Sequence, residues 1–219
     1  MSRLAGAQVE RPPGKKYASA LRFAEIRPPL PVPRAGTLAR WREDLADDFE
    51  LALEAPLGTF RSAAGELRID DGVHERVVWL RDAVSALRAF ALVVRTSAEV
   101  TPSKRDRDRL AACLDLLRVD GVQLVWEARG MWEPEELSAR AVELGVVPAF
   151  DPLVAPAPRV GAFDYARVRT VGQRARISEG LLYEIDQALA TSERAYVAIE
   201  SSQSFRRATE LQALFDAAR

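Results

Sequence analysis

Short apolar segments that end in one or two charged residues recur along the chain, and helix-length amphipathic stretches separate most of them. Seven of these segments are predicted strands, and they cover residues 23–27, 49–54, 91–95, 122–127, 146–151, 166–169 and 195–200. Strands that alternate with helices indicate a parallel sheet. Sites in α/β folds lie at the carboxyl ends of such strands, so the terminal charges are the first candidates for function.

Apolar residues at helical spacing mark the stretches between the strands. The clearest predicted helix covers residues 73–87, where the apolar positions recur at spacings of four and three residues. Further predicted helices are a short one over 17–22, one over 37–45, one capped by Thr101 with Pro102 at its first position and ended by Gly121, one from Glu133-Pro134 to Gly145, and two that begin at the caps Ser178 and Ser204.

These elements fit a compact (β/α)₈ barrel of the TIM type. Eight units in this chain average about 27 residues each, which is near the lower size limit of that fold. The eighth strand has to come from the N-terminus, where Ala7-Gln8-Val9 is the candidate, so we expect an irregular or degenerate first βα unit. Residues 1–14 are predicted to be a flexible segment and residues 15–219 one barrel domain. The alternative is an open doubly wound sheet, which lacks its usual Gly-rich turn here.

Composition narrows the class of protein. The chain has no run of about 18 apolar residues that could cross a membrane. It also lacks an apolar signal core at its N-terminus, so we expect a cytoplasmic protein with no membrane partner. The formal net charge of −1 and pI near 6.0 differ from those of a dedicated nucleic-acid binder. Cys113 has no second cysteine to pair with and lies between helical leucines, which is typical of a buried structural thiol.

Several common catalytic and cofactor motifs are absent. The chain has no G-x-G-x-x-G, no P-loop, no H-E-x-x-H and no haem motif. His74 is the sole histidine and lies at the start of a predicted surface helix, which disfavours Ser-His-Asp or Cys-His catalysis. One histidine and one cysteine cannot supply a histidine-rich zinc cluster.

The charges at the strand ends are the main candidate site, and closure of a barrel would bring them to one rim. They are Glu25, Arg27, Glu54, Arg95, Glu127, Arg129, Asp151, Arg169 and Glu200. Carboxylates at a rim can hold a hard cation such as Mg²⁺ or Mn²⁺, or can act as general acid and base. Arginines can bind a carboxylate or a phosphate in a bidentate way. The alternative is a self-satisfied network of salt bridges over the barrel core.

Two further groups have a functional and a structural interpretation. Arginines cluster in and after the predicted strand 166–169, which is the seventh when the N-terminal strand is counted first. Barrels often bind phosphate there, or these arginines form a solvated loop; they are Arg167, Arg169, Arg174 and Arg176, with Arg206 and Arg207 near the last helix. Trp126 and Trp132 flank a charged turn and could stack on sugars or bases, although core packing is the simpler interpretation. Residues 104–109 alternate in sign, which is typical of a solvated helix face.

Several segments resemble motifs of the YecE-like family, known as domain of unknown function 72 (DUF72), from about residue 15 to the end. Residues 48–56 resemble a strand motif "FxFAxKAP", and residues 125–129 with Trp132 resemble "VEFRHPSW". Further matching segments are Phe23-Ala24-Glu25-Ile26, Arg40-Trp41, Arg169-Thr170-Val171-Gly172, Tyr196 to Ser201, and Arg207-Ala208 with Leu211.

This resemblance implies a TIM-type barrel and a divergent member of the family. Glu25, Glu127 and Arg129 keep the motif residue. Other motif positions differ: the lysine is Glu54, the two histidines are Gly130 and Val171, the paired asparagines are Glu200 and Ser201, and a later asparagine is Arg207. The glycine- and aromatic-rich first strand "GTSGW" of the family is also missing. The family has no established biochemical role, so the resemblance predicts fold more than function.

Three functional hypotheses follow, in order of preference. The first is a non-catalytic barrel that binds a small anionic ligand or a protein partner through Arg27, Arg95, Arg129, Arg169, Glu200 and Arg207. The second is a divalent-metal-dependent hydrolase or phosphoesterase that uses Glu25, Glu127 and Asp151, with nucleic-acid-derived substrates as one option. The third is a nucleic-acid-binding protein with Arg169, Arg174, Arg176 and Arg207 as phosphate contacts. The sequence does not define an oligomeric state.

Overall fold

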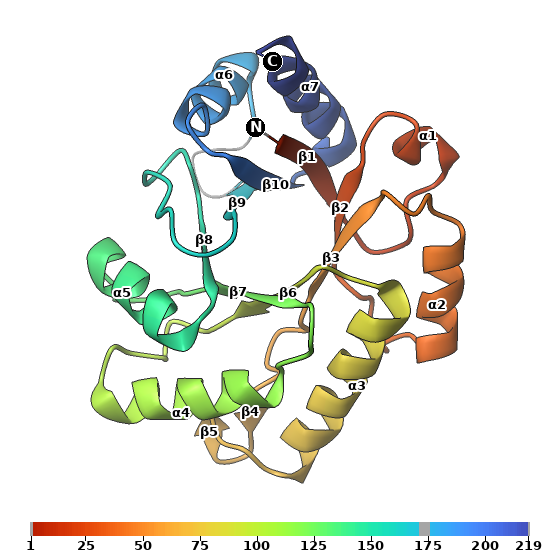
Figure 1. Ribbon diagram of the computed structural model, residues 1–219. Helices are drawn as coiled ribbons and strands as arrows, with labels where there is room; N and C mark the ends of the chain where they lie inside the picture. Colours follow the sequence, from red (N-terminus) through yellow and green to blue (C-terminus); the bar gives the residue numbers. More distant parts are fainter. Residues whose placement is uncertain (1, 171–175, 219) are drawn as a thin grey trace.

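Eight parallel strands form a closed barrel in the computed structural model, which describes residues 2–170 and 176–218. The strand order around the barrel is β1-β10-β9-β8-β7-β6-β3-β2, and the helices lie outside it (Figure 1). The strands are β1 Ser2–Val9, β2 Phe23–Ile26, β3 Glu50–Glu54, β6 Ala91–Arg95, β7 Gln123–Glu127, β8 Val147–Phe150, β9 Asp164–Arg169 and β10 Arg194–Glu200. The TIM-type barrel predicted from the strand–helix alternation is confirmed.

The helices follow most of the predicted positions. They are α1 Lys15–Ala18, α2 Ala35–Glu43, α3 Asp71–Leu87, α4 Lys104–Leu116, α5 Pro134–Leu144, α6 Glu179–Ala188 and α7 Ser204–Ala217. Strand β8 continues to β9 without an intervening helix, and a two-stranded hairpin of β4 Arg61–Ser62 and β5 Gly65–Glu66 precedes α3. Of the described helices, none has the length and apolar character needed to cross a membrane.

Several predicted helix ends are wrong by a few residues: the helices predicted over 17–22 and 37–45 lie at Lys15–Ala18 and Ala35–Glu43. Ser103, not Thr101, caps α4, since its hydroxyl accepts a hydrogen bond from the Asp106 N–H. Gly121 lies in the turn before β7, after α4 has already ended at Leu116. Ser204 is the first residue of α7 rather than its cap, whereas Ser178 caps α6 as predicted.

The N-terminal segment differs from the prediction. Residues 2–9 form a full barrel strand that pairs with β10 on one side and β2 on the other, so they are not a loose extension. Leu4, Ala5 and Ala7 are buried in it, although the small size of the two alanines and the short apolar run give a weak strand signal. The irregular part of the first βα unit is its helix, because α1 makes one turn over Lys15–Ala18.

Alternation along each strand divides the core into two regions, as the two-residue period of a strand requires. Outward side chains such as Ile26, Leu53 and Trp126 pack under the helices. Inward side chains such as Phe23, Tyr165 and Tyr196 fill the barrel, with Phe90 stacked on Tyr196 at 4.3 Å between ring centroids. Aromatic rings therefore fill the amino-terminal end of the barrel interior and leave the carboxyl end to the charged residues.

Three side chains that the sequence offers as alternatives for a functional role, Trp126, Cys113 and His74, lie away from the mouth of the barrel or in its packed core. Trp126 is fully buried, donates its indole N–H to the Thr96 hydroxyl and meets Trp132 edge to face, as core packing predicts. Cys113 is buried, and burial raises the pKa of its thiol to about 12, with a smaller contribution from Glu66. His74 lies exposed in the first turn of α3. We assign none of the three to a site.

Gly6 of β1 lies directly against the backbone of β2. A β-carbon at Gly6 would come 2.3 Å from the carbonyl oxygen of Phe23. We therefore expect Gly6→Ala to lower the free energy of unfolding by about 1–3 kcal/mol, because the close-packed interior has no room for it. Gly36→Ala in α2 is the control, since nothing lies within 4 Å of its added carbon. Urea unfolding that finds the two variants equally stable would contradict this packing.

Candidate functional site

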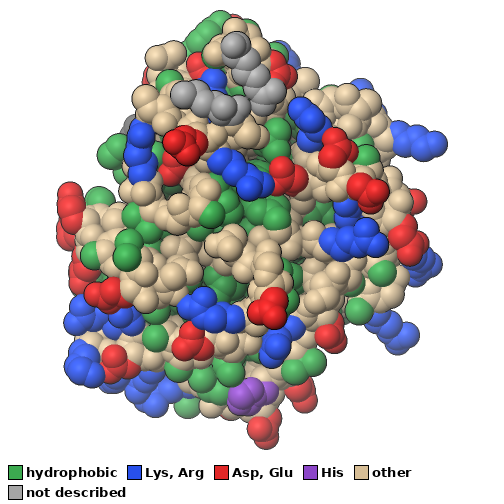
Figure 2. Space-filling view, viewed as in Figure 1, with side chains coloured by type: hydrophobic (Ala, Val, Ile, Leu, Met, Phe, Trp, Pro, Cys, Tyr) green, Lys and Arg blue, Asp and Glu red, His purple; other side chains and the backbone are tan. Residues whose placement is uncertain are grey.

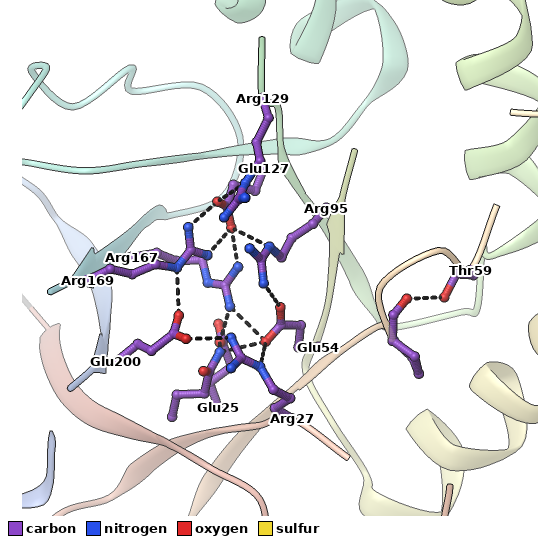
Figure 3. Close-up of polar contacts among 12 residues, drawn as sticks. Glu25, Arg27, Glu54, Thr59, Arg95, Glu127, Arg129, Arg167, Arg169 and Glu200 are labelled. Atoms are coloured by element: carbon purple, nitrogen blue, oxygen red, sulfur yellow. Dashed lines mark hydrogen bonds and ion pairs between the residues drawn. The ribbon is translucent and has the colours of Figure 1, made fainter. Parts of the chain in front are cut away.

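A layer of charged side chains closes the carboxyl end of the barrel (Figure 3). Most members follow an inward core residue by two positions, so strand alternation carries them to the barrel axis: Glu25 follows Phe23, Glu54 follows Ala52, and Glu127 follows Val125. The network comprises Glu25, Arg27, Glu54, Arg95, Glu127, Arg129, Arg167, Arg169 and Glu200. The pattern of apolar strands that end in charge therefore describes one connected layer.

Arg167 of β9 is the centre of this network. Its Nη2 lies 2.5 Å from Glu25 Oε1 and 2.9 Å from Glu54 Oε2, while its Nη1 binds Glu127. Burial would lower the pKa of this guanidinium, but the three carboxylates raise it well above its ordinary value. Arg167 therefore remains a cation and neutralises charges from three different strands.

A second set of arginines closes the network around this centre. Arg169 binds Glu127 and lies 2.7 Å from Glu200, its neighbour in register on β10. Arg27 joins Glu200 to Glu54, at 2.9 and 3.0 Å respectively. Arg95 Nη1 donates to Glu54 Oε1 at 2.8 Å. The pairs thus connect strands that are far apart in the sequence and hold the mouth of the barrel together.

Two neutral side chains complete the coordination of the buried carboxylates. Gln8 Nε2 lies 2.6 Å from both Glu25 and Glu54. The Tyr165 hydroxyl donates to Glu25 Oε2 at 2.9 Å. Burial, and then the charge of Glu25, raise the pKa of Tyr165 well above its ordinary value, so the phenol stays protonated as a donor. These contacts satisfy oxygen atoms that would be costly to bury alone.

Three carboxylates of the network, Glu54, Glu127 and Glu200, are held in the charged form. Burial alone would raise the pKa of Glu127, but the hydrogen bond from Arg169 and the charges of Arg167, Arg169 and Arg95 lower it to about 2. The same opposition of burial and arginine charge lowers the pKa of Glu54 and of Glu200. These groups are anions at neutral pH, which disfavours a general-acid role for Glu127.

Arg129 is the least neutralised cation of the network. Its Nε lies 3.8 Å from Glu127 Oε1, beyond hydrogen-bond distance, and 47% of its side chain is exposed. Partial burial, and then the charge of Arg95, lower the pKa of this guanidinium. The described network holds four carboxylates and five guanidiniums, so Arg129 carries a surplus positive charge at the solvent edge.

The donor set does not resemble a metal site. In the ranges 2–170 and 176–218, no three His, Cys, Asp or Glu side chains come together as ligands for a metal ion. Glu25, Glu54 and Glu127 instead share the guanidinium of Arg167. A divalent cation at these oxygens would have to compete with arginine charge at hydrogen-bond distance.

The structure brings together most, but not all, of the predicted site residues. Glu25, Glu127, Arg27, Arg95, Arg129, Arg169 and Glu200 meet in the network. Asp151 follows β8 and accepts a hydrogen bond from the Leu153 N–H at 3.0 Å, in a turn beyond the strand. Arg207 lies in the first turn of α7 and pairs with Glu210 at 2.6 Å. The metal-binding trio of Glu25, Glu127 and Asp151 thus stays a prediction.

The structure describes part of the predicted phosphate site, which the sequence places in the loops after β9 and β10. Arg176 and Arg207 line a small pocket of about 140 Å³ with Thr170 and residues 201–203. The predictions that involve Val171, Gly172 and Arg174 lie outside the described residues. On the face seen in Figure 2, Lys and Arg side chains of the described part of the chain are interspersed with Asp and Glu. That face presents no continuous basic stripe.

The charges at the strand ends do not mark Arg167, Gln8 or Tyr165 as members of the network. The sequence predicts Arg167 only as one of the arginines in and after its strand, whereas in the structure Tyr165, Arg167 and Arg169 alternate on the inward face of β9. That alternation was the available signal. Gln8 follows small residues on a strand that was scarcely visible in the sequence, so no comparable signal marks it.

Fold and site together define a TIM-type barrel protein whose mouth is filled by an arginine–glutamate network. No known protein-family model matches the chain, and no curated protein matches it. Solved structures do match. A DUF72 family protein from Enterococcus faecalis V583 has a TM-score of 0.74 at 12% identity, with 98% of this chain and 95% of that chain covered.

Two other solved structures share the fold over nearly their whole length. A DUF72 family protein from Thermotoga maritima MSB8 has a TM-score of 0.69 at 14% identity and covers 99% of this chain and 100% of its own. D-psicose 3-epimerase from Clostridium cellulolyticum H10, solved with D-tagatose, has a TM-score of 0.61 at 12% identity, with 100% of this chain and 98% of that chain covered. The structural comparison agrees with the resemblance to DUF72 in the sequence, and at these identities it demonstrates a shared fold.

Proposed function

We propose that the chain is a divergent barrel of the DUF72 type that binds a small anionic ligand at its mouth. The observation that carries this proposal is the charge balance of the network. Each of its four carboxylates pairs with at least one arginine, and Arg129 is left as surplus cation at the solvent edge. An anion that reaches Arg129 gains charge-assisted hydrogen bonds without displacing an existing partner.

The replaced motif positions support this interpretation. Glu54 stands where the family motif has lysine, and the guanidiniums of Arg27, Arg95 and Arg167 surround it. A change of sign at one position is thereby compensated by arginines that lie in or just after three other strands. The mouth of this chain is consequently better suited to hold an anion in a fixed electrostatic environment than to supply a titrating acid or base.

Thermal unfolding with added ions tests the proposal. Phosphate, sulfate or acetate at about 100 times its Kd should stabilise the protein by about 2.7 kcal/mol, a shift of several degrees in Tm. Arg129→Gln should remove that shift, because it deletes the surplus charge while it leaves the paired carboxylates intact. Arg206→Gln is the matched control, since that arginine lies on α7 and pairs with Glu210.

The other outcomes separate the remaining hypotheses. Stabilisation by Mg²⁺ or Mn²⁺ that disappears in Glu127→Gln would overturn the anion proposal in favour of a metal-dependent hydrolase. A Tm that responds to no anion, in wild type and Arg129→Gln alike, would also overturn it. Equal loss of the phosphate shift in Arg129→Gln and Arg206→Gln would indicate non-specific surface binding instead.

A further inference from the structure

A pocket of about 300 Å³ lies beside the network, between the loops that follow β3, β6 and β7. This volume is at the lower end of the range for small-molecule sites. Its charged lining is Arg61, Glu66, Arg95 and Arg129, and its apolar lining is Leu57, Phe60, Leu67 and Ala98. The pocket therefore combines cationic groups from the network with apolar walls from the loops.

The charge of the pocket favours an acidic ligand. Three guanidinium groups and one carboxylate face it. Arg95 is 7% exposed, and its Nε makes no hydrogen bond; Glu127 Oε2, at 3.6 Å, is too distant to accept one. This Nε atom is closed to solvent, so Arg95 contributes positive charge to the lining and not an open donor. The surplus charge of Arg129 lies in the same lining.

The apolar part of the lining is suited to a hydrocarbon group. Phe60 and Leu67 are buried and form a wall, whereas Leu57 is 73% exposed at the edge. An exposed leucine beside a pocket with such a wall can cover an apolar group that enters it. Arg129 and Leu57 come from different loops but line the same pocket.

Hydrogen bonds hold the loop after β3 in place. Arg76 of α3 donates to the carbonyl oxygens of Thr59 at 3.0 Å and of Arg61 at 2.6 Å. The Thr59 hydroxyl donates to the Pro56 carbonyl at 2.7 Å. Arg61 also pairs with Glu66 and Glu99. These ion pairs neutralise its charge and connect the β4–β5 hairpin to the loop after β6. A wall that is already ordered loses little entropy when a ligand binds.

From these observations we infer that the pocket binds a small carboxylate with a short aliphatic or aromatic body. The carboxylate pairs with the guanidinium of Arg129, beside the positive charge of Arg95, and the apolar body packs against Leu57 and the wall behind it. This inference rests on the proposed function and names its ligand class. A planar carboxylate suits guanidinium donors because it can accept two parallel hydrogen bonds.

Isothermal titration calorimetry with a series of carboxylates tests the inference. Acetate, butyrate, hexanoate and 3-phenylpropionate carry the same acid group on bodies of increasing size. Each buried methylene should strengthen binding about threefold to fourfold, so hexanoate should bind at least tenfold more tightly than acetate. Hexylammonium and hexanol, which lack the negative charge, should bind at least tenfold more weakly than hexanoate.

Variants separate the acidic and apolar contacts. Arg129→Gln should weaken every carboxylate of the series about tenfold or more. Leu57→Asn should weaken hexanoate about fivefold and leave acetate unchanged, because it removes apolar contact without touching the charge. Val154→Asn is the matched control, since Val154 is 77% exposed on the loop after β8 and does not line the pocket. It should leave every affinity unchanged.

The results distinguish failure of the inference from failure of the proposed function. If phosphate or acetate binds through Arg129 but affinity does not rise along the series, the ligand class is wrong and the proposed anion site stands. If hexylammonium binds as tightly as hexanoate, the acid requirement is overturned. If no anion of either experiment binds, both proposals fail.

Discussion

Arg167→Met is expected to lower the free energy of unfolding by about 3–5 kcal/mol, because it leaves buried carboxylates without their shared counter-ion. Glu25 is fully buried and Glu54 is nearly so. These two carboxylates and that of Glu127 all pair with Arg167. Methionine fills part of the space but supplies neither charge nor hydrogen-bond donor. Urea unfolding at pH 7, followed by circular dichroism, measures the loss.

Two further variants identify the cause of the stability loss in Arg167→Met. Arg206→Met removes an arginine whose side chain is 64% exposed in its pair with Glu210, and it should cost less than about 1 kcal/mol. Adding Glu25→Gln to Arg167→Met should recover part of the stability, since it removes one of the orphaned charges. A loss below about 1 kcal/mol in Arg167→Met would mean that the network is not an energetic unit.

Acid should destabilise the protein through the same residues. The pKa of Glu127 is lowered from 4.5 to about 2 in the folded state, and those of Glu54 and Glu200 are lowered as well. A folded-state pKa below the unfolded value contributes stability at pH above the unfolded value and loses it as pH falls through the folded one. Glu127 should therefore contribute about 3 kcal/mol at neutral pH, which is lost between about pH 4.5 and pH 2.

Glu127→Gln tests this pH dependence. The variant should be less stable than wild type at pH 7, and the two curves of unfolding free energy should converge near pH 2, where wild-type Glu127 is protonated. Glu75→Gln, at an exposed position of α3, is the control for loss of a carboxylate as such. Curves for wild type and Glu127→Gln that stay parallel down to pH 2 would show that Arg167 and Arg169 do not hold this carboxylate as an anion.

The fold was largely predictable because each barrel strand except β1 can be recognised in the sequence as an apolar run. Ala91–Arg95 and Gln123–Glu127 illustrate this, since burial on both faces leaves β-branched and aromatic residues up to the charged end. Strand β1 was the exception. Apart from Leu4, its residues Ala5, Gly6 and Ala7 have little apolar surface each, and what makes them a strand is pairing with β10 and β2.

The sequence predicts most of the residues that meet in the network, but it does not predict how they pair. Alternation along a strand tells which side chains share the inward face, and that rule finds Glu25, Glu127 and Glu200. It does not tell which arginine meets which glutamate, because partners such as Arg167 and Glu25 come from strands that are not neighbours. The pocket was not predicted, since Leu57 and Arg61 lie in a loop without periodicity.

Closure between β1 and β10 has a consequence for the order in which the barrel folds. Ser2–Val9 precedes the other strands of the described barrel in the chain, whereas its partner Arg194–Glu200 follows them. Until β10 has been synthesised, one edge of β1 has no strand to pair with, and the inner layer of arginines and glutamates is only partly neutralised. The barrel therefore cannot close before β10 is present, and in the meantime β1 has β2 and the Tyr17 hydroxyl of α1 as partners.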